Sequence, residues 1–74
     1  MIRIADPTAV GAVVADLRAM SRLTQRELCD QVGMDPSRLS GWGNGHTTPT
    51  LAYLVPVLRV LGYQLVITLE EDTP

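Results

Sequence analysis

The chain has 74 residues, one cysteine, one histidine and a formal net charge of -2 at pH 7. This length allows one domain over residues 1–74, and a domain so small is often stabilised by a disulfide, a metal or a second subunit. The lone cysteine excludes an intramolecular disulfide, and one histidine with one cysteine cannot complete a four-ligand zinc site. Association with a second subunit is the option that remains.

The negative net charge argues against a nucleic-acid partner, because phosphate neutralisation dominates nucleic-acid affinity. The distribution of charge weakens that objection. Three of the eight acids are Glu70, Glu71 and Asp72, so residues 1–69 carry six Arg against five acids. All six cations are Arg, which is the better bidentate partner for guanine edges and phosphates. The charge balance therefore leaves a DNA partner open without indicating one.

The sequence predicts neither a membrane protein nor an enzyme. No apolar run approaches the roughly 20 residues needed to span a bilayer, and the N-terminus lacks the layout of a signal peptide. We therefore expect a cytoplasmic location, a reduced cysteine and no membrane partner. With a single imidazole and no lysine, the chain also lacks the residues of a catalytic site, so we expect no enzymatic activity, no cofactor and no metal.

A first helix is expected over residues 7–20. Asp6 and Pro7 supply its N-cap and its first-turn proline. Met1–Ile4 alternates in polarity and is either a frayed terminus or a short edge strand. The apolar face of the helix follows the i, i+3, i+4, i+7 spacing and consists of Val10, Val13, Val14 and Leu17.

Arg18 and Arg22 are spaced one helical turn apart, beyond this apolar face. Two interpretations of the pair are open. The first is a solvated surface, which is common for exposed arginines, and the second is a clamp on a nucleic-acid phosphate.

Two short helices joined by a tight turn are expected in the middle of the chain. Thr24 and Glu27 match a capping box, in which the hydroxyl and the carboxylate each bind a backbone N–H at the start of a helix. The first short helix therefore covers residues 25–32, and Gly33 can take the left-handed conformation that ends it. Cys29 within it is interpreted as a buried structural residue, with a redox switch as the alternative.

The second short helix is expected over residues 36–43, with Asp35 as N-cap and Pro36 in the first turn. Leu39 and Trp42 are spaced to face inward, so Trp42 is expected in the core before any interface role. The opposite side of this helix is short and polar, and its residues are Ser37, Arg38, Ser40, Gly41 and Asn44.

The last helix is expected over residues 50–61, after an irregular loop of glycine, threonine and proline. Thr48 or Thr50 caps it and Gly62 stops it. Pro56 predicts a kink or a late start, because an interior proline lacks an N–H and clashes with the preceding turn. The expected apolar face consists of Leu51, Leu54, Val55, Leu58 and Leu61.

Residues 63–70 change from a helical period to an alternation of period two, which predicts a β-strand. A lone strand leaves unpaired backbone groups and an apolar face, which a second copy of the chain can cover. We therefore expect a homodimer joined by antiparallel C-terminal strands. The alternative is a monomer in which residues 1–4 pair with residues 64–69. The residues expected at the dimer interface are Tyr63, Leu65, Ile67 and Leu69.

The central motifs resemble those of the lambda-repressor-like, or XRE, family of helix-turn-helix DNA-binding proteins. The resemblance covers roughly residues 10–62. One difference is Gly43, where the family usually has a Glu that helps to fix the end of the recognition helix. The motifs that carry the resemblance are Gln25, Glu27-Leu28-Cys29, Val32-Gly33, Leu39-Ser40-x-Trp42-x-Asn44-Gly45, Thr48-Pro49-Thr50-Leu51 and Leu61-Gly62.

The chain after Gly62 is most similar to the HipB-type antitoxin branch of this family. The resemblance implies a mainly α fold, a four-to-five-helix domain with a short C-terminal β-strand that pairs across a dimer. It also implies double-stranded DNA as a partner, because two recognition helices related by a two-fold axis read a palindromic operator in successive major grooves.

By the same resemblance, Gln25 contacts a phosphate at a helix N-terminus. Arg38 either reads a guanine through two hydrogen bonds or contacts the DNA backbone. His46 and Thr47 are either phosphate donors or solvated loop residues. The full set of expected DNA-contacting residues is Gln25, Arg26, Ser37, Arg38, Ser40, Gly41, Asn44, His46 and Thr47.

The implied function is that of a sequence-specific transcriptional regulator, a dimeric repressor of the antitoxin type that autoregulates its operon. Two alternatives stay open. One is a protein-interaction module that neutralises a cognate toxin and binds DNA secondarily. The other is a small phage-type repressor.

Overall fold

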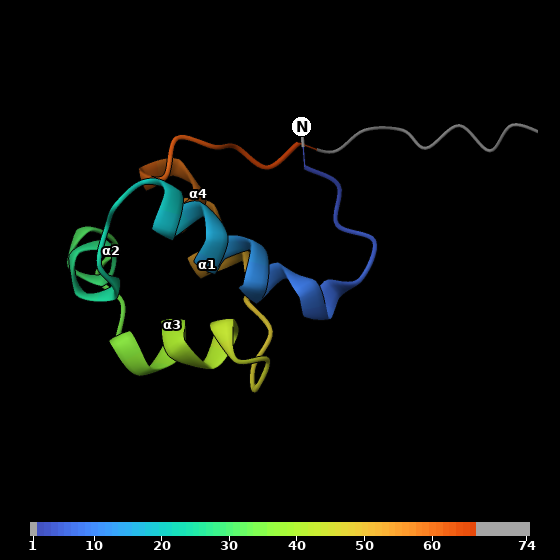
Figure 1. Ribbon diagram of the computed structural model, residues 1–74, viewed down its shortest axis with the longest axis horizontal. Helices are drawn as coiled ribbons and strands as arrows, with labels where there is room; N and C mark the ends of the chain where they lie inside the picture. The colour runs from blue at the N-terminus through green and yellow to red at the C-terminus, as the bar shows by residue number, and fades with distance from the viewer. Residues whose placement is uncertain (1, 67–74) are drawn as a thin grey trace, which may run out of the picture.

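The computed structural model describes residues 2–66, which form one short 3₁₀ helix and four α-helices (Figure 1). The described residues contain no β-strand, so the expected mainly α fold is confirmed for this part of the chain. No helix within it is long and apolar enough to span a bilayer. In chain order the elements are η1 (Pro7–Ala9), α1 (Val10–Met20), α2 (Gln25–Val32), α3 (Pro36–Gly43) and α4 (Leu51–Val60).

The four α-helices surround one apolar core. Helix α1 packs on α3, and α2 packs on both α3 and α4. Figure 1 shows α1 at the centre, with α3 below it and α2 at one end. No polar or charged residue is buried within residues 2–66. The core consists of Val14, Leu17, Leu28, Cys29, Met34, Leu39, Trp42, Leu54, Val57, Leu58 and Leu61.

The first expected helix divides into two parts, because it begins as the 3₁₀ turn η1 and becomes α-helical at Val10. Asp6 caps η1, since its Oδ1 accepts hydrogen bonds from the backbone N–H and the hydroxyl of Thr8 at 2.9 and 2.8 Å. Along α1, Val14 and Leu17 are buried while Val10 and Val13 pack at the edge of the core.

Gly11 is a packing residue that the apolar pattern did not identify. It is buried on α1, and a Cβ atom placed on it would overlap the carbonyl group of Trp42 on α3. Only glycine allows the two helices to come this close, because any other residue would force their backbones apart. The contact fixes the distance between α1 and α3.

The expected pairing of Arg18 and Arg22 on one helix is wrong. Helix α1 ends at Met20, and Arg22 has a left-handed backbone with φ of 58°. The side chain of Arg18 contacts the backbone that follows α1, and its Nη1 donates to the carbonyl oxygen of Leu23 at 2.7 Å. Arg18 therefore stabilises the connection between α1 and α2.

Helix α4 differs from expectation at its beginning. Thr50 is the N-cap by backbone conformation, but its side chain makes no capping hydrogen bond. Leu51 is 64% exposed, whereas the buried stripe includes Val57, which the pattern had omitted. The core face of α4 is therefore turned relative to the predicted one and consists of Leu54, Val57, Leu58 and Leu61.

Pro56 lies inside α4, and the helix begins before it, so the expected late start does not occur. A proline at this position removes the N–H that would pair with the carbonyl oxygen of Ala52. Both Pro56 and Ala52 are exposed. Water can therefore bind the free carbonyl oxygen, and burial of Val57 and Leu58 holds the helix together on its other side.

Helix α4 is closed by Gly62, which has φ of 89°, and by the N–H of Tyr63, which donates to the carbonyl oxygen of Leu58 at 2.8 Å. Residues 63–66 have no regular secondary structure. All four side chains of this segment are exposed, and three of them are large and hydrophobic, namely Tyr63, Leu65 and Val66. The remainder of the expected strand, with Ile67 and Leu69 of the expected dimer interface, lies outside the described residues.

Candidate nucleic-acid interface

The start of α2 is built by the predicted capping box, which the structure confirms. The N–H of Thr24 donates to Oε1 of Glu27 at 2.9 Å, and the N–H of Glu27 donates to Oγ1 of Thr24 at 3.0 Å. The hydrogen bond from the Thr24 N–H favours the carboxylate form and lowers the pKa of Glu27 from its ordinary value. The backbone N–H groups of Gln25 and Arg26 have no partner within the described residues and remain free to bind an anion.

The turn between α2 and α3 is fixed on both sides. Gly33 ends α2 in the left-handed conformation with φ of 70°, as predicted. The N–H of Met34 then donates to the carbonyl oxygen of Cys29 at 2.9 Å, and the Met34 side chain enters the core. Sequence reasoning missed Met34 because a single turn residue belongs to no periodic pattern. Its burial anchors the turn and so fixes the angle between the two helices.

Helix α3 begins with the predicted N-cap Asp35, followed by Pro36. Oδ1 of Asp35 accepts from both the backbone N–H and the hydroxyl of Ser37, each at 2.9 Å. The two hydrogen bonds, helped by the charge of Arg38, lower the pKa of Asp35. Because the only hydroxyl proton of Ser37 is donated to Asp35, its oxygen is left with acceptor capacity alone.

Helix α3 turns an apolar side to the core and a polar side outward. Leu39 and Trp42 are buried, as predicted. Ser37, Arg38 and Ser40 are exposed on the other side. The core contacts hold the helix from behind, so its polar side is presented on a rigid support.

Gly41 is placed differently from the other expected DNA-contacting residues of α3. It is half-buried beneath the following loop, where its carbonyl oxygen accepts from the N–H groups of His46 and Thr47 at 2.9 and 3.2 Å. A Cβ on Gly41 would approach Oγ1 of Thr47 to 2.9 Å. Gly41 therefore shapes the loop, and its expected contact with DNA stays a prediction.

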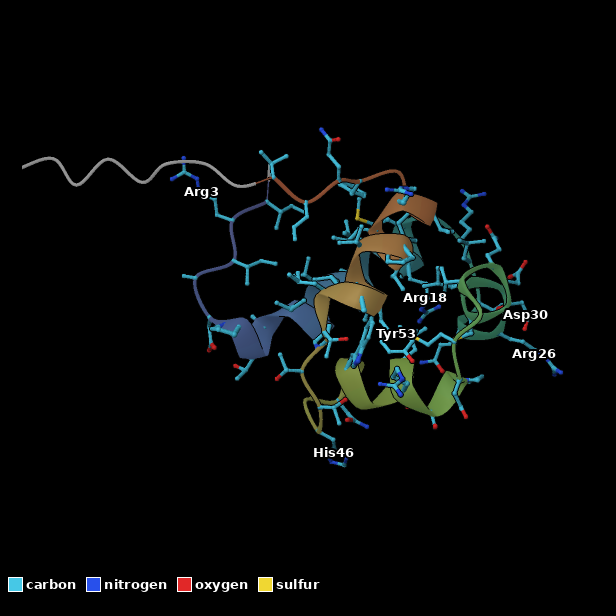
Figure 2. The ribbon with its side chains drawn as sticks, turned by 180° about the vertical axis from the view of Figure 1, so that it is seen from behind. Arg3, Arg18, Arg26, Asp30, His46 and Tyr53 are labelled. Carbon is cyan, nitrogen blue, oxygen red and sulfur yellow. The ribbon has the colours of Figure 1, made fainter. Side chains whose placement is uncertain are left out.

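The loop after α3 is a tight turn. Oδ1 of Asn44 accepts from the N–H of His46 at 3.1 Å, and Gly45 has a left-handed φ of 79°. Part of the Asn44 side chain is thus used inside the turn, and the exposed His46 lies at the far tip of the loop (Figure 2). Thr47 is exposed beside it.

Arg38 has a partner that the sequence did not reveal. Its guanidinium carbon Cζ lies 4.2 Å from the centroid of the Tyr53 ring on α4, which is a cation–π distance. Figure 2 shows Tyr53 extending from α4 toward α3. No local spacing rule connects residues on two separate helices, so this pair becomes visible only in the folded chain.

Cys29 is buried in the core, as predicted. Burial raises the pKa of its thiol, and the nearby charges of Asp30 and Asp35 act in the same direction. A buried thiol held in its neutral form is a poor nucleophile and a poor redox sensor. Cys29 is therefore a structural residue.

The exposed residues of α2, α3 and the loop that the sequence predicted to contact DNA are here called the α2–α3 face. It extends from Arg26 on α2, along α3, to His46 (Figure 2). Its two arginines are Arg26 and Arg38. The face consists of Gln25, Arg26, Ser37, Arg38, Ser40, Asn44, His46 and Thr47.

Comparison with known proteins gives a family and a fold. Residues 14–67 match the family described as Helix-turn-helix. No curated protein matches the chain. The clp gene regulator ClgR from Corynebacterium glutamicum has a similar structure, with a TM-score of 0.73 and 29% identity. The alignment covers 78% of this chain and 62% of the ClgR chain, so this chain spans less than two thirds of that protein.

Two further structures are similar over nearly the whole chain. One is a complex of HipB with an O4 20mer, and the other is a HipA-HipB-O2-O3 complex. Each aligns with a TM-score of 0.74 and 25% identity, covering 99% of this chain and 100% of the other. These similarities confirm the expected lambda-repressor-like arrangement of helices.

Proposed function

Because the chain belongs to the Helix-turn-helix family, we propose that it is a sequence-specific DNA-binding transcriptional regulator, a dimeric repressor of the antitoxin type. The observation that carries the proposal is the α2–α3 face, in which a core-anchored helix exposes Ser37, Arg38 and Ser40. Two similar structures are complexes of HipB, one with an O4 20mer and one with HipA and O2-O3, which supports DNA as the ligand. We place this non-enzymatic regulator in the cytoplasm.

The start of α2 binds the DNA backbone in this proposal. The free N–H groups of Gln25 and Arg26 and the positive end of the helix dipole favour a phosphate. The Gln25 side chain adds a hydrogen bond, and Arg26 adds a charge. Contacts of this kind orient the protein on the duplex and carry no sequence information.

Helix α3 reads bases in the major groove. Arg38 donates two hydrogen bonds to O6 and N7 of a guanine, which is worth about 1–3 kcal/mol of discrimination. With its proton donated to Asp35, Ser37 can accept from a base donor, such as the amino group of cytosine or adenine. Ser40, Asn44, His46 and Thr47 extend the contact along the groove and onto the backbone.

A second copy of the chain completes the binding surface. One α2–α3 face has only two arginines, so a single copy neutralises few phosphates. Two copies related by a two-fold axis double these contacts and read the two halves of a palindrome. We assign the dimer interface to the C-terminal segment with Tyr63, Leu65, Ile67 and Leu69. The exposure of Tyr63 and Leu65 supports this assignment.

A toxin is a second class of partner. The similar HipA-HipB-O2-O3 structure contains a second protein besides HipB. We propose by analogy that this chain binds a cognate toxin and represses the operon that encodes both. The alternative of a phage-type repressor requires DNA and the dimer but no toxin, so an adjacent toxin-like reading frame distinguishes the two.

Selection from a pool of randomised DNA duplexes tests DNA recognition. We expect the full chain to enrich a palindrome, with an affinity that falls steeply between about 50 and 200 mM salt. Arg38→Ala should relax the preference at one base pair in each half-site, and an unchanged preference would reject base reading by Arg38. A chain that enriches no sequence and binds DNA without salt dependence would overturn the proposed function.

Two substitutions at the start of α2 test the backbone contacts. Gln25→Ala should weaken binding to all duplexes about equally, by about tenfold, because it removes one hydrogen bond to a charged group. Since glutamine is uncharged, the salt dependence should stay the same. Arg26→Ala is the matched variant, and it should lower the slope of log affinity against log salt by about one.

A further inference from the structure

The contact between Arg38 and Tyr53 is not explained by the stability of the fold. Arg38 is exposed on α3, and its guanidinium lies over the Tyr53 ring at 4.2 Å. An exposed cation–π contact adds little to the stability of a fold, because both groups are well hydrated when apart. The arrangement nevertheless holds a long side chain in one place at the centre of the α2–α3 face.

The stack leaves the hydrogen-bonding capacity of Arg38 available. A guanidinium is planar, and its N–H donors point outward within that plane. The Tyr53 ring lies on one side of the guanidinium carbon, so the N–H donors directed away from the ring stay available. A guanine edge can therefore accept two hydrogen bonds from Arg38 while the stack stays in place.

Tyr53 is itself firmly placed. It is half-buried and packs against the hydrophobic core near the start of α4, between the buried Leu54 and the loop that follows α3. Tyrosine has only two side-chain torsions, so its ring loses little freedom when it supports another group. Arginine has many more, and fixing it at an interface opposes binding unless it is already ordered.

We propose that Tyr53 is a positioning residue for DNA recognition, which holds the guanidinium of Arg38 in the orientation that reads a guanine. This inference rests on the proposed function and extends it to a residue of α4 that lies outside the helix-turn-helix itself. Without the ring, Arg38 samples many orientations, including those directed at the nearby carboxylate of Asp35.

Matched substitutions separate the ring from the hydroxyl. Tyr53→Phe keeps the ring face and removes only the oxygen, whereas Tyr53→Leu keeps an apolar side chain for the core and removes the ring. For the duplex selected by the full chain, Tyr53→Leu should weaken binding about 2- to 10-fold and Tyr53→Phe by less than about twofold. The loss should be concentrated at the base pair whose preference Arg38→Ala also relaxes, because a purely structural defect would weaken all duplexes equally.

A double-mutant cycle ties the effect to Arg38. In an Arg38→Ala background, Tyr53→Leu should cause no further loss of base preference. Arg59→Ala is the control for removing a cation, since Arg59 is exposed in the last turn of α4, at the other end of the helix from Tyr53. It should leave the base preference unchanged.

A measurement without DNA tests the stack separately. In the free full chain, the Arg38 side-chain protons should show upfield NMR shifts from the Tyr53 ring, which persist in Tyr53→Phe and disappear in Tyr53→Leu. Absence of these shifts in the parent chain would overturn the inference, whatever its DNA binding.

The DNA experiment has three outcomes that overturn the inference. If Tyr53→Phe loses affinity as Tyr53→Leu does, the hydroxyl is responsible and not the stack. If Tyr53→Leu keeps the parent base preference, Tyr53 has no positioning role and the proposed function stands. If the parent chain enriches no sequence although the NMR shifts are present, the proposed function is wrong. The role of Tyr53 in DNA recognition is then wrong as well, although its contact with Arg38 exists.

Discussion

At the scale of single residues, Gly11 determines how closely α1 approaches α3. A Cβ at this position would overlap the Trp42 carbonyl group, which belongs to the backbone and cannot move aside as a flexible side chain would. Trp42, whose buried side chain anchors α3 to the core, therefore has its backbone packed against Gly11. Changes at Gly11 are therefore transmitted to the α2–α3 face.

Gly11→Ala should destabilise the protein. Overpacking a buried contact lowers the free energy of unfolding by typically about 1–3 kcal/mol, and this outweighs the gain in helix propensity from replacing a helical glycine. Urea denaturation followed by circular dichroism measures the change. Gly43→Ala is the matched control, because a Cβ at Gly43 meets nothing within 4 Å. Equal stability of the two variants would contradict the close-packing role of Gly11.

Arg18 and Arg38 are both arginines, but their side chains make different kinds of contact. Its side chain bonds the carbonyl oxygen of Leu23 and supports the connection into α2. Arg38 instead makes a cation–π contact with Tyr53, and its guanidinium donates no hydrogen bond to another of residues 2–66. Spacing in the sequence predicted neither contact, since both depend on where the backbone turns.

At the scale of the elements, the capping residues at their ends determine where α2 and α3 begin and where α2 stops. The capping box at Thr24 and Glu27, the left-handed Gly33 and the N-cap Asp35 all lie where the sequence predicted. Such signals are reliable because each involves residues two to four positions apart, whose geometry the helix itself fixes. The end of α4 nearest the loop had no side-chain cap, and there the prediction of the buried face was less accurate.

The capping carboxylates predict a dependence of stability on acid. The pKa values of Asp6, Glu27 and Asp35 are all lowered by hydrogen bonds from backbone N–H groups. The unfolded chain therefore binds more protons between these lowered values and the ordinary ones, so stability is full above about pH 5 and falls as the pH drops through the folded pKa values.

Thermal unfolding measured between about pH 6 and about pH 3 tests this expectation. Glu27→Gln is the informative variant, because its amide oxygen can still accept from the Thr24 N–H but does not titrate. It should lose less stability than the parent over the same pH range. Parallel curves for the two chains would show that the capping box does not contribute to the acid sensitivity.

At the scale of the whole molecule, the core of the described residues 2–66 lies entirely before the C-terminal segment. Among these residues the last one in the core is Leu61, and Tyr63 contributes the N–H that closes α4. Leu65 and Val66 beyond it are exposed. This division suggests that the helical domain folds as a unit and that the residues after it serve association.

A chain that ends after Gln64 should remain helical but lose the dimer. It keeps the core and the closing hydrogen bond of α4, and it removes Leu65 together with Ile67 and Leu69 of the proposed interface. Sedimentation equilibrium should give a monomer for the shortened chain and a dimer for the full chain. Circular dichroism checks that the shortened chain is folded. A shortened chain that still sediments as a dimer would place the interface elsewhere.

The sequence by itself determined the helical elements, their caps, most of the core and the side of α3 that is exposed. It did so because these features depend on spacing within one helix. The register of the apolar face of α4 was only partly correct, since Leu51 is exposed and Val57 is buried. A hydrophobic stripe gives the approximate direction of a helix face, and packing against neighbouring helices decides its exact rotation.

The tertiary structure alone decided the contacts between helices. No pattern along the chain indicated that Gly11 meets Trp42 or that Arg38 lies over Tyr53. Gly41 belonged to the expected DNA-contacting set, yet it lies under the loop. Residues far apart along the chain become neighbours only through the packing of whole helices, and no short-range rule encodes their distance.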